Sequence, residues 1–494
     1  MMRPTFLALS GVTIFLGAAC SSPSLTGTTF SCQTSADCTG GLVCTPVGTT
    51  KGCVAASTAP LRIGMSAALK GSSGALGTEM KHGIDAAFKA FNAAGGVNGR
   101  ELVLDARDDN YDPMLAVANV NSLIDFQAPG PPDMPDMTGP NKVIALLGDV
   151  GTPTMLTTFP IAIKNGVAFF APFTGAQKFL RDGTNSKFSF NYRAGYNDET
   201  EAMVDYITRF RTPRITDAAH IMVFAQNDGY GDAGYKGVAA AYNKNTPPLP
   251  PAPTTGIKRI DYDRADPTGA QTKAAAIQAE AYLEALPPPV APATKTSVAI
   301  AMIDTYQAAS TFIRLVKLWL NENATRANLY DLNFINVSFV GADALAAQLK
   351  NFPDTYPDVS DPMKMNSYAQ GVMVTQVVPY YLASSPAAIT YRKDIMTLDQ
   401  GFTFNFTSFE GHLAARLFIE GIKANGPVFD GPTLAQTFET KVMNADLGIQ
   451  VPIGFSSINH QGLHTVWFST MKADATFDVS NKWDPVTPGH ISPN

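Results

Sequence analysis

Cysteine is absent from most of this chain. All five cysteines among the 494 residues lie before Pro60, at positions 20, 32, 38, 44 and 53. Histidine is also scarce, with 6 residues scattered singly. No CxxC pair occurs and no histidine lies near the cysteines, so the sequence disfavours a zinc site.

Runs of basic residues are absent too. Lysine and arginine number 36 against 42 acidic residues, which gives a net charge of −6. This balance argues against a nucleic-acid partner, and mild acidity supports solubility. No GxSxG elbow, HExxH helix or Walker A loop is present, and no GxGxxG fingerprint opens the first predicted helix. We therefore expect neither an enzyme nor a bound cofactor.

The N-terminus carries an export signal. Arg3 precedes a short apolar run from Phe6 to Ala19, too short to span a bilayer, and small residues stand before Cys20. Gly-Ala-Ala-Cys resembles a bacterial lipobox, in which the cysteine is lipidated after cleavage, although Leu16 lies one place further from Cys20 than usual. Cys20 is thus a candidate lipidation site. The alternative is plain secretion with Cys20 as a free thiol.

The other four cysteines lie in a Gly-, Thr- and Ser-rich segment. Cys32, Cys38, Cys44 and Cys53 fall close together in an exported chain, which favours two disulfides that hold a segment without a core in one shape. Three pairings are possible and the sequence does not choose among them.

Alternating apolar strands and amphipathic helices follow Pro60. Helices are expected near residues 80–91, 116–124, 199–211, 307–320 and 344–349, and strands at 61–65, 102–106, 143–147, 167–171, 220–224, 298–302 and 338–340. This alternation predicts an α/β fold of two doubly wound lobes. Proline-rich stretches at 129–140, 247–253 and 287–292 are expected to be surface insertions.

Two helix starts have capping signals. Asp112 followed by Pro113 predicts an N-cap with proline at the first helical position. Thr407 and Glu410 have the spacing of a capping box ahead of an apolar helical face.

Several motifs, taken in order, resemble one family. They are Asn92–Arg100, Asp108–Pro113, Gly151–Thr154, Ala171–Ala176, Asn227–Gly231 and Gly341–Asp343. Across roughly residues 61 to 480 the chain resembles the periplasmic binding proteins of type I, in particular the branched-chain amino-acid-binding (Leu/Ile/Val-binding) substrate-binding subunits of ABC importers. The resemblance implies two Rossmann-like lobes, joined by three crossover strands, that close on one small ligand.

The resemblance also implies a division of the chain. Residues 1–19 are the expected signal peptide, and 20–60 a lipoprotein tether with the Cys-rich segment. Residues 61–189 and 371–462 are expected to form the first lobe, 190–370 the second lobe, and 463–494 a return to the second lobe with a C-terminal tail.

Candidate ligand contacts in the first lobe follow two strands. The resemblance gives the Thr152 hydroxyl, beside Gly151, the role of holding a ligand carboxylate; Thr152 could instead only cap the following helix. Phe173 and Thr174 match the second binding loop. Phe173 is either a pocket wall or an ordinary core residue.

Candidate contacts in the second lobe include two acids and two aromatic residues. Asp343 matches an acid that pairs with the ligand's α-ammonium group, or else it caps a helix. Tyr230 and Tyr306 match aromatic positions that cover the ligand, and Asp304 is a second possible cation partner. Leu76 departs from the aromatic lid residue common in amino-acid binders, which leaves the ligand class open.

The sequence thus predicts an exported, lipid-anchored solute-binding protein of the periplasm or cell envelope. It would capture a small polar ligand, such as an amino acid, and present its closed state to ABC permease subunits. The alternative is a sensing module whose closed state is presented to a signalling partner.

Overall fold

The computed structural model describes most of the chain from residue 30 onward. It covers residues 30–494 except 33–36, 40–41, 48–49, 56–57, 125–142, 178–180, 182–185, 246–255, 292, 353–355, 358–364, 427 and 488. The signal peptide, Cys20 and the proline-rich stretches at 129–140 and 247–253 lie outside the described residues. Among those described, no helix is long and apolar enough to cross a membrane.

The first lobe is built on a five-stranded parallel sheet. Its strands, in spatial order, are β5 (Leu102–Asp108), β4 (Leu61–Ala67), β6 (Ala145–Leu147), β7 (Ala168–Phe170) and β8 (Ser189–Phe190). The chain therefore winds outward in both directions from β4. The carboxyl ends of β4 and β6 flank the switch point, where open α/β sheets place their ligands.

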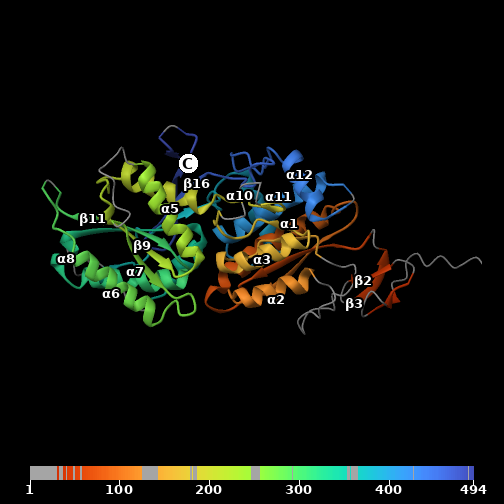
Figure 1. Cartoon of the computed structure of the whole chain (residues 1–494), viewed down its shortest axis with the longest axis horizontal. Coiled ribbons are helices and arrows are strands. Elements are labelled where there is room, and N and C mark those ends of the chain that lie inside the picture. Colours follow the sequence, from red (N-terminus) through yellow and green to blue (C-terminus); the bar gives the residue numbers. More distant parts are fainter. Residues whose placement is uncertain are drawn as a thin grey trace, which may run out of the picture.

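Helices from both ends of the chain cover this sheet. They are α1 (Gly74–Ala93), α2 (Pro113–Ile124), α3 (Thr152–Lys164), α10 (Pro386–Leu398), α11 (Phe406–Ala424) and α12 (Gly431–Lys441). Figure 1 shows the orange and yellow helices beside the blue ones. Glycine allows α1 and α11 to pack closely. A Cβ on Gly83 would overlap the backbone carbonyl of Ser408, and one on Gly411 would overlap that of Met80.

The second lobe has an eight-stranded mixed sheet. Its spatial order is β10 (Lys258–Tyr262), β9 (Ile221–Gln226), β11 (Thr296–Ile303), β12 (Tyr330–Asn336), β15 (Met373–Gln376), β16 (Val466–Met471), β17 (Phe477–Trp483) and β18 (Ile491–Pro493). The strands from β10 to β15 run parallel, and β16 to β18 are added antiparallel at one edge. Its helices are α4 (Tyr196–Asp205), α5 (Gly229–Asn245), α6 (Ala270–Glu284), α7 (Tyr306–Asn321), α8 (Ala324–Leu329) and α9 (Ala342–Lys350). A separate two-strand ribbon joins β13 (Tyr356–Pro357) to β14 (Met365–Asn366).

The chain passes between the sheets three times. The crossings run from β8 to α4, from β15 to α10, and from Gln461, which bridges to Asn191, to β16. β15 begins just after residue 371, where the sequence places the return to the first lobe, and it still pairs with β12. The predicted α/β fold of two lobes joined by three crossover strands is confirmed.

Most predicted elements are confirmed, and two local predictions are wrong. The segment Ser338–Val340 forms a 3-10 turn rather than a strand: Val340 N and Gly341 N donate to Val337 O and Ser338 O, and Gly341 has a φ of 76°. Helix α11 is capped by Asn405, whose side chain accepts from Ser408 N, so Thr407 and Glu410 form no capping box. Asp112 does cap α2, accepting from Met114 N and Leu115 N.

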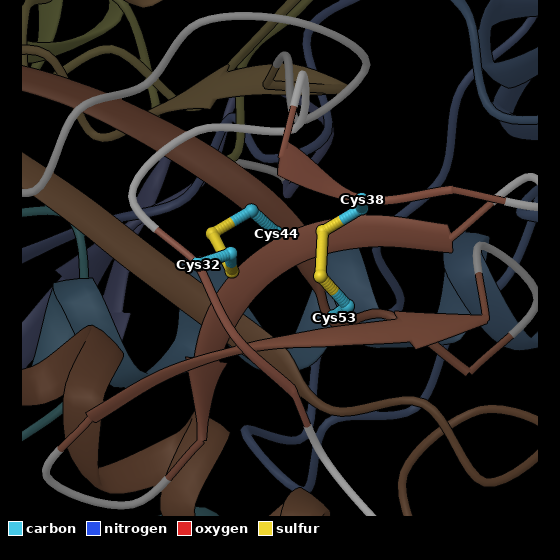
Figure 2. The surroundings of a disulfide bond; sticks show 4 residues. All are labelled: Cys32, Cys38, Cys44 and Cys53. Carbon is cyan, nitrogen blue, oxygen red and sulfur yellow. A yellow bond between two sulfur atoms is a disulfide. The ribbon is translucent and has the colours of Figure 1, made fainter. Parts of the chain in front are cut away.

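The cysteine segment forms a small sheet of its own. Strands β1 (Phe30–Ser31), β3 (Thr50–Ala55) and β2 (Leu42–Val47) pair antiparallel in that order. Figure 2 shows two disulfides side by side, joining Cys32 to Cys44 and Cys38 to Cys53. The two predicted disulfides are confirmed, and the pairing that the sequence left open is established. In Figure 1 this sheet lies beyond the first lobe, away from the green second lobe.

Candidate functional site

The loop between β6 and α3 forms the first-lobe side of the site. Gly151, the N-cap of α3, has a φ of 106°, which glycine adopts without strain, and a Cβ there would overlap the Tyr111 ring. Thr152 is the first residue of the helix and is 1% exposed. The unpaired N–H groups and partial positive charge of the α3 N-terminus therefore accompany the Thr152 hydroxyl.

Thr152 and Thr174 bring two hydroxyls together at this helix end. Their Oγ1 atoms are 2.7 Å apart, and Thr174 Oγ1 also accepts from Ala176 N. Thr152 does not cap α3, because Gly151 holds the N-cap position and Thr154 Oγ1 bonds back to Val150 O. One hydroxyl donates to the other, so the pair has one hydrogen left to donate to an anionic group, the ligand chemistry that helix N-termini favour.

Tyr196, at the start of α4 in the second lobe, approaches this pair. Burial raises the pKa of Tyr196, and the nearby Thr152 and Thr174 hydroxyls counter that effect in part. Tyr196 N donates to Gly175 O, and a Cβ on Gly175 would overlap the Tyr196 ring. The sequence reasoning missed Tyr196; the only available signal was an aromatic residue directly after the first crossover.

Aromatic side chains from both lobes meet beside the threonines. This aromatic cluster comprises Tyr111, Phe173, Tyr196, Tyr230 and Phe339, all 3% exposed or less. Ring centroids are 5.2 Å apart for Tyr196 and Tyr230, 4.8 Å for Tyr230 and Phe339, and 5.2 Å for Phe173 and Phe339. Phe173 therefore belongs to the core and borders the site at once.

Asp304 lies at the carboxyl end of β11, next to this cluster. It is wholly buried, and neither carboxylate oxygen has a hydrogen-bond partner in the part of the chain that the structure describes. Burial raises the pKa of Asp304 well above its ordinary range. Tyr230 donates its hydroxyl to the backbone oxygen of Asp304 at 3.0 Å.

Asp343 and Tyr306 lie along a neighbouring seam between the lobes. Asp343 Oδ1 accepts from Tyr381 at 2.8 Å, and Oδ2 accepts from the backbone N of Phe406, the first residue of α11, at 2.9 Å. Tyr306 accepts from Ala75 N at 3.5 Å. The structure thus brings Gly151, Thr152, Phe173, Thr174 and Tyr230 together, whereas both oxygens of Asp343 already bond to the first lobe.

A buried ionic group at the first crossover was also missed by sequence reasoning. Arg193, 1% exposed, pairs with Glu199 of α4 at 3.2 Å, with Glu410 of α11 at 3.5 Å, and with the Ser338 hydroxyl. Its guanidinium lies 4.9 Å from the centre of the Phe173 ring. Burial raises the pKa of Glu410 to about 7, against the opposing effect of Arg193. This group joins the two lobes directly behind the aromatic cluster.

Further contacts hold the lobes together around the site. Gln226 of β9 donates to the Tyr111 hydroxyl at 3.3 Å, and Arg264 donates to the Tyr111 backbone oxygen. Since Tyr111 follows β5 in the first lobe, these contacts join the two lobes directly. The structure is therefore a closed arrangement of the two lobes.

One group of side chains has the composition of a metal site. Ligand atoms of Glu201, Asp205 and His490 lie within 4.8 Å of one another. Glu201 is paired with Lys244 at 2.5 Å, and Asp205 accepts from His490 and from Trp483 at 2.7 Å each. These partners already balance the carboxylates, so the group is not assigned to a metal.

A family comparison agrees with the fold. The family model described as periplasmic binding protein matches residues 60–313. The chain belongs to this family. Among solved structures, a possible leucine/isoleucine/valine-binding protein from Rhodopirellula baltica has a TM-score of 0.68 and 29% identity, covering 86% of this chain and 97% of that one.

Other relatives are more distant. The Leu/Ile/Val-binding protein homolog 3 of Brucella melitensis is 24% identical over 218 residues, 44% of this chain and 50% of that protein, so the chain spans about half the length of this curated relative. A fatty acid ABC transporter substrate-binding protein from Thermomonospora curvata has a TM-score of 0.62 at 14% identity, covering 85% of this chain and 91% of that one. At that identity the likeness shows the fold alone.

Proposed function

We propose that this protein is an exported solute-binding protein that captures a small carboxylate-bearing ligand, an amino acid or a related compound, for an ABC importer. The observation that carries the proposal is the Thr152 and Thr174 hydroxyl pair at the N-terminus of α3, buried against Tyr196 of the other lobe. In this proposal residues 61–189 and 371–462 serve as the first lobe, and 190–370 and 463–494 as the second.

Capture proceeds by ligand-driven closure. The first lobe offers its hydroxyl pair and helix N-terminus to the ligand carboxylate, and Tyr196 and Tyr230 of the second lobe reach the ligand only when the cleft closes. A ligand shifts the equilibrium toward the closed state only by its extra contacts there, so the second-lobe groups drive closure. The closed form is then presented to permease subunits in the membrane.

The ligands named for the Leu/Ile/Val-binding relatives fit this assignment. Leucine, isoleucine and valine are amino acids that differ in their apolar side chains. They share a carboxylate. The hydroxyl pair at α3 is suited to that shared group, which supports its role in this chain.

A thermal-shift screen tests the proposal. The chain from Ala59 onward is mixed with amino acids, small amides, aromatic acids and short peptides. A ligand that binds only the native state stabilises it by RT ln(1 + [L]/Kd), about 2.7 kcal/mol at a hundredfold excess over Kd. We expect the compounds that raise the melting temperature to carry a carboxylate. Stabilisation only by compounds that lack a carboxylate would contradict the proposal.

Import and sensing are the two alternatives, and they differ in the partner that binds the closed form: an ABC permease or a signalling protein. Genes for permease and ATPase subunits beside this gene support import, and an adjoining histidine kinase gene supports the sensing alternative. The mechanism of closure is the same in both.

We also propose that Cys20 anchors the protein to a membrane of the cell envelope. Changing Cys20→Ser is expected to move the protein from the membrane fraction to the soluble fraction, because a lipidated cysteine is the proposed membrane attachment. Fractionation followed by immunoblotting measures this, with Ser21→Ala as the control that keeps the cysteine. Equal membrane partitioning of Cys20→Ser and the unmodified chain would rule out this anchor.

A further inference from the structure

Asp304 is an anomaly in the closed cleft. Its side chain is wholly buried with both carboxylate oxygens unpartnered, and it makes no ion pair in the described part of the chain. A buried ionised carboxylate without a partner is strongly unfavourable. A stable closed state therefore needs a proton on Asp304 or a positive group beside it.

The neighbours of Asp304 do not supply that positive group. The titrating side chains on which the charge of Asp304 acts include Tyr230 of α5 and Tyr262 of β10, whose pKa values burial raises first and Asp304 raises further. Tyr230 gives its hydroxyl hydrogen to the Asp304 backbone oxygen, and Tyr262 gives its own to Gln226 Oε1 at 2.9 Å while accepting from Thr305 N at 3.1 Å. Both phenols are thus engaged elsewhere.

The aromatic environment favours a cation at this place. Tyr230 belongs to the aromatic cluster, and its ring lies 5.2 Å from that of Tyr196, which adjoins the two threonines. Aromatic rings attract cations through their negative faces, and desolvation strengthens the effect. A carboxylate with free acceptors beside such rings combines both means of recognising an ammonium group.

The second acid of the cleft, Asp343, lacks this property. Its two oxygens accept from Tyr381 and from Phe406 N, and both donors belong to the part of the chain that returns to the first lobe. Asp343 thus stabilises closure directly, with or without a ligand. Only Asp304 has both acceptor oxygens left for one.

We propose that Asp304 is the partner of the ligand's cationic group and the residue that selects zwitterions over plain carboxylic acids. This inference rests on the proposed function, since it needs a ligand whose carboxylate lies at Thr152 and Thr174. A ligand without the cation leaves Asp304 buried and unpaired. Sites built to pair with a polar group reject analogues that lack it far more strongly than apolar pockets reject a missing methylene.

The test compares amino acids with their deaminated counterparts. The probes are the twenty common amino acids and the carboxylic acids with the same side chains but no amino group. The proteins are the unmodified full-length chain, Asp304→Asn, and Asp343→Asn as the matched acid control. Dissociation constants from titration calorimetry give, for each protein, the ratio between an amino acid and its counterpart.

In the unmodified protein the best amino acid is expected to bind at least about a hundredfold more tightly than its counterpart. Asp304→Asn should reduce that ratio below about tenfold, and Asp343→Asn should weaken both compounds of the pair equally. An unchanged ratio in Asp304→Asn, or a ratio that falls only in Asp343→Asn, would overturn the inference while leaving ligand capture intact. Binding of neither class to the unmodified protein would overturn the proposed function as well.

A second readout needs no ligand. Because Asn has no charge to bury, unliganded Asp304→Asn is expected to melt at a higher temperature than the unmodified protein. If Asp304→Asn fails to fold, Asp304→Ser takes its place in the titrations. A lower melting temperature for both variants would show that Asp304 stabilises the fold itself, which overturns its assignment to a ligand.

Discussion

Arg193→Ala is expected to lower the free energy of unfolding by about 3–5 kcal/mol, because it leaves buried carboxylates without their cation. Glu199 and Glu410 both depend on Arg193, and their side chains are 0% and 5% exposed. Urea denaturation of the chain from Ala59 onward measures the change. Lys423→Ala is the control: its pair with Glu420 is about half exposed on both sides, so the loss should stay within about 1 kcal/mol.

A second substitution separates charge from packing at this position. If the loss in Arg193→Ala comes from the unpaired carboxylates, adding Glu410→Gln should restore part of the stability, since it removes one buried charge. The Arg193 guanidinium also lies over the Phe173 ring, and that packing is not restored. An Arg193→Ala variant that loses no more than Lys423→Ala would show that the crossover network does not hold the lobes together.

Glu79→Gln is expected to change how stability depends on pH. Burial raises the pKa of Glu79 from 4.5 to about 8, with a further rise from Asp343 across the lobe interface and an opposing effect of Thr407. Glu79 Oε2 is buried and has no hydrogen-bond partner among the residues that the structure describes. The folded protein therefore holds a proton on Glu79 that the unfolded chain releases above pH 4.5.

The direction in which stability changes with pH follows from that proton. The contribution of Glu79 is fully present below pH 4.5, and it is lost as the pH rises to about 8. Between these pH values the free energy of unfolding of the unmodified protein should fall, relative to that of Glu79→Gln, by up to about 1.4 kcal/mol per pH unit. The stability of Glu79→Gln relative to the unmodified protein therefore increases as the pH rises. Denaturation at several pH values measures the difference, and the exposed Glu101→Gln serves as control. Parallel profiles for the unmodified protein and Glu79→Gln would contradict the assignment.

The fold could be predicted because its main signals are local. The parallel strands β4, β9 and β11 are buried along their whole length and mostly apolar, and α1 and α7 show apolar residues at helical spacing. β15 and the antiparallel strands β16 to β18 were not predicted. β15 has only four residues, and β17 alternates buried and exposed positions only in part. Neither strand therefore shows the regular alternation of apolar and polar residues from which a strand is predicted.

The sequence predicts where Gly151, Thr152 and Thr174 of the first lobe and Tyr230 of the second lobe lie, but not the partners of Arg193 and Asp343. Gly151, Thr152 and Thr174 follow directly after strands, so their placement depends on neighbouring residues. Arg193 and Asp343 have partners far along the chain: Arg193 bonds Ser338 across 145 residues, and Asp343 bonds Phe406 across 63. The position of a residue in a motif does not predict which distant group will donate a hydrogen bond to its carboxylate. This is why Asp343 and Asp304 could not be told apart from the sequence.

Calorimetric titration of Thr152→Ala tests the central claim most directly. The titrant is the compound that gives the largest thermal shift, and Thr157→Ala, an exposed threonine on the same helix, is the control. A hydrogen bond to a charged group contributes roughly 1.5–3 kcal/mol, so Thr152→Ala should weaken binding about tenfold to a hundredfold while Thr157→Ala leaves it unchanged. Equal affinities for Thr152→Ala and Thr157→Ala would contradict a ligand held at the start of α3.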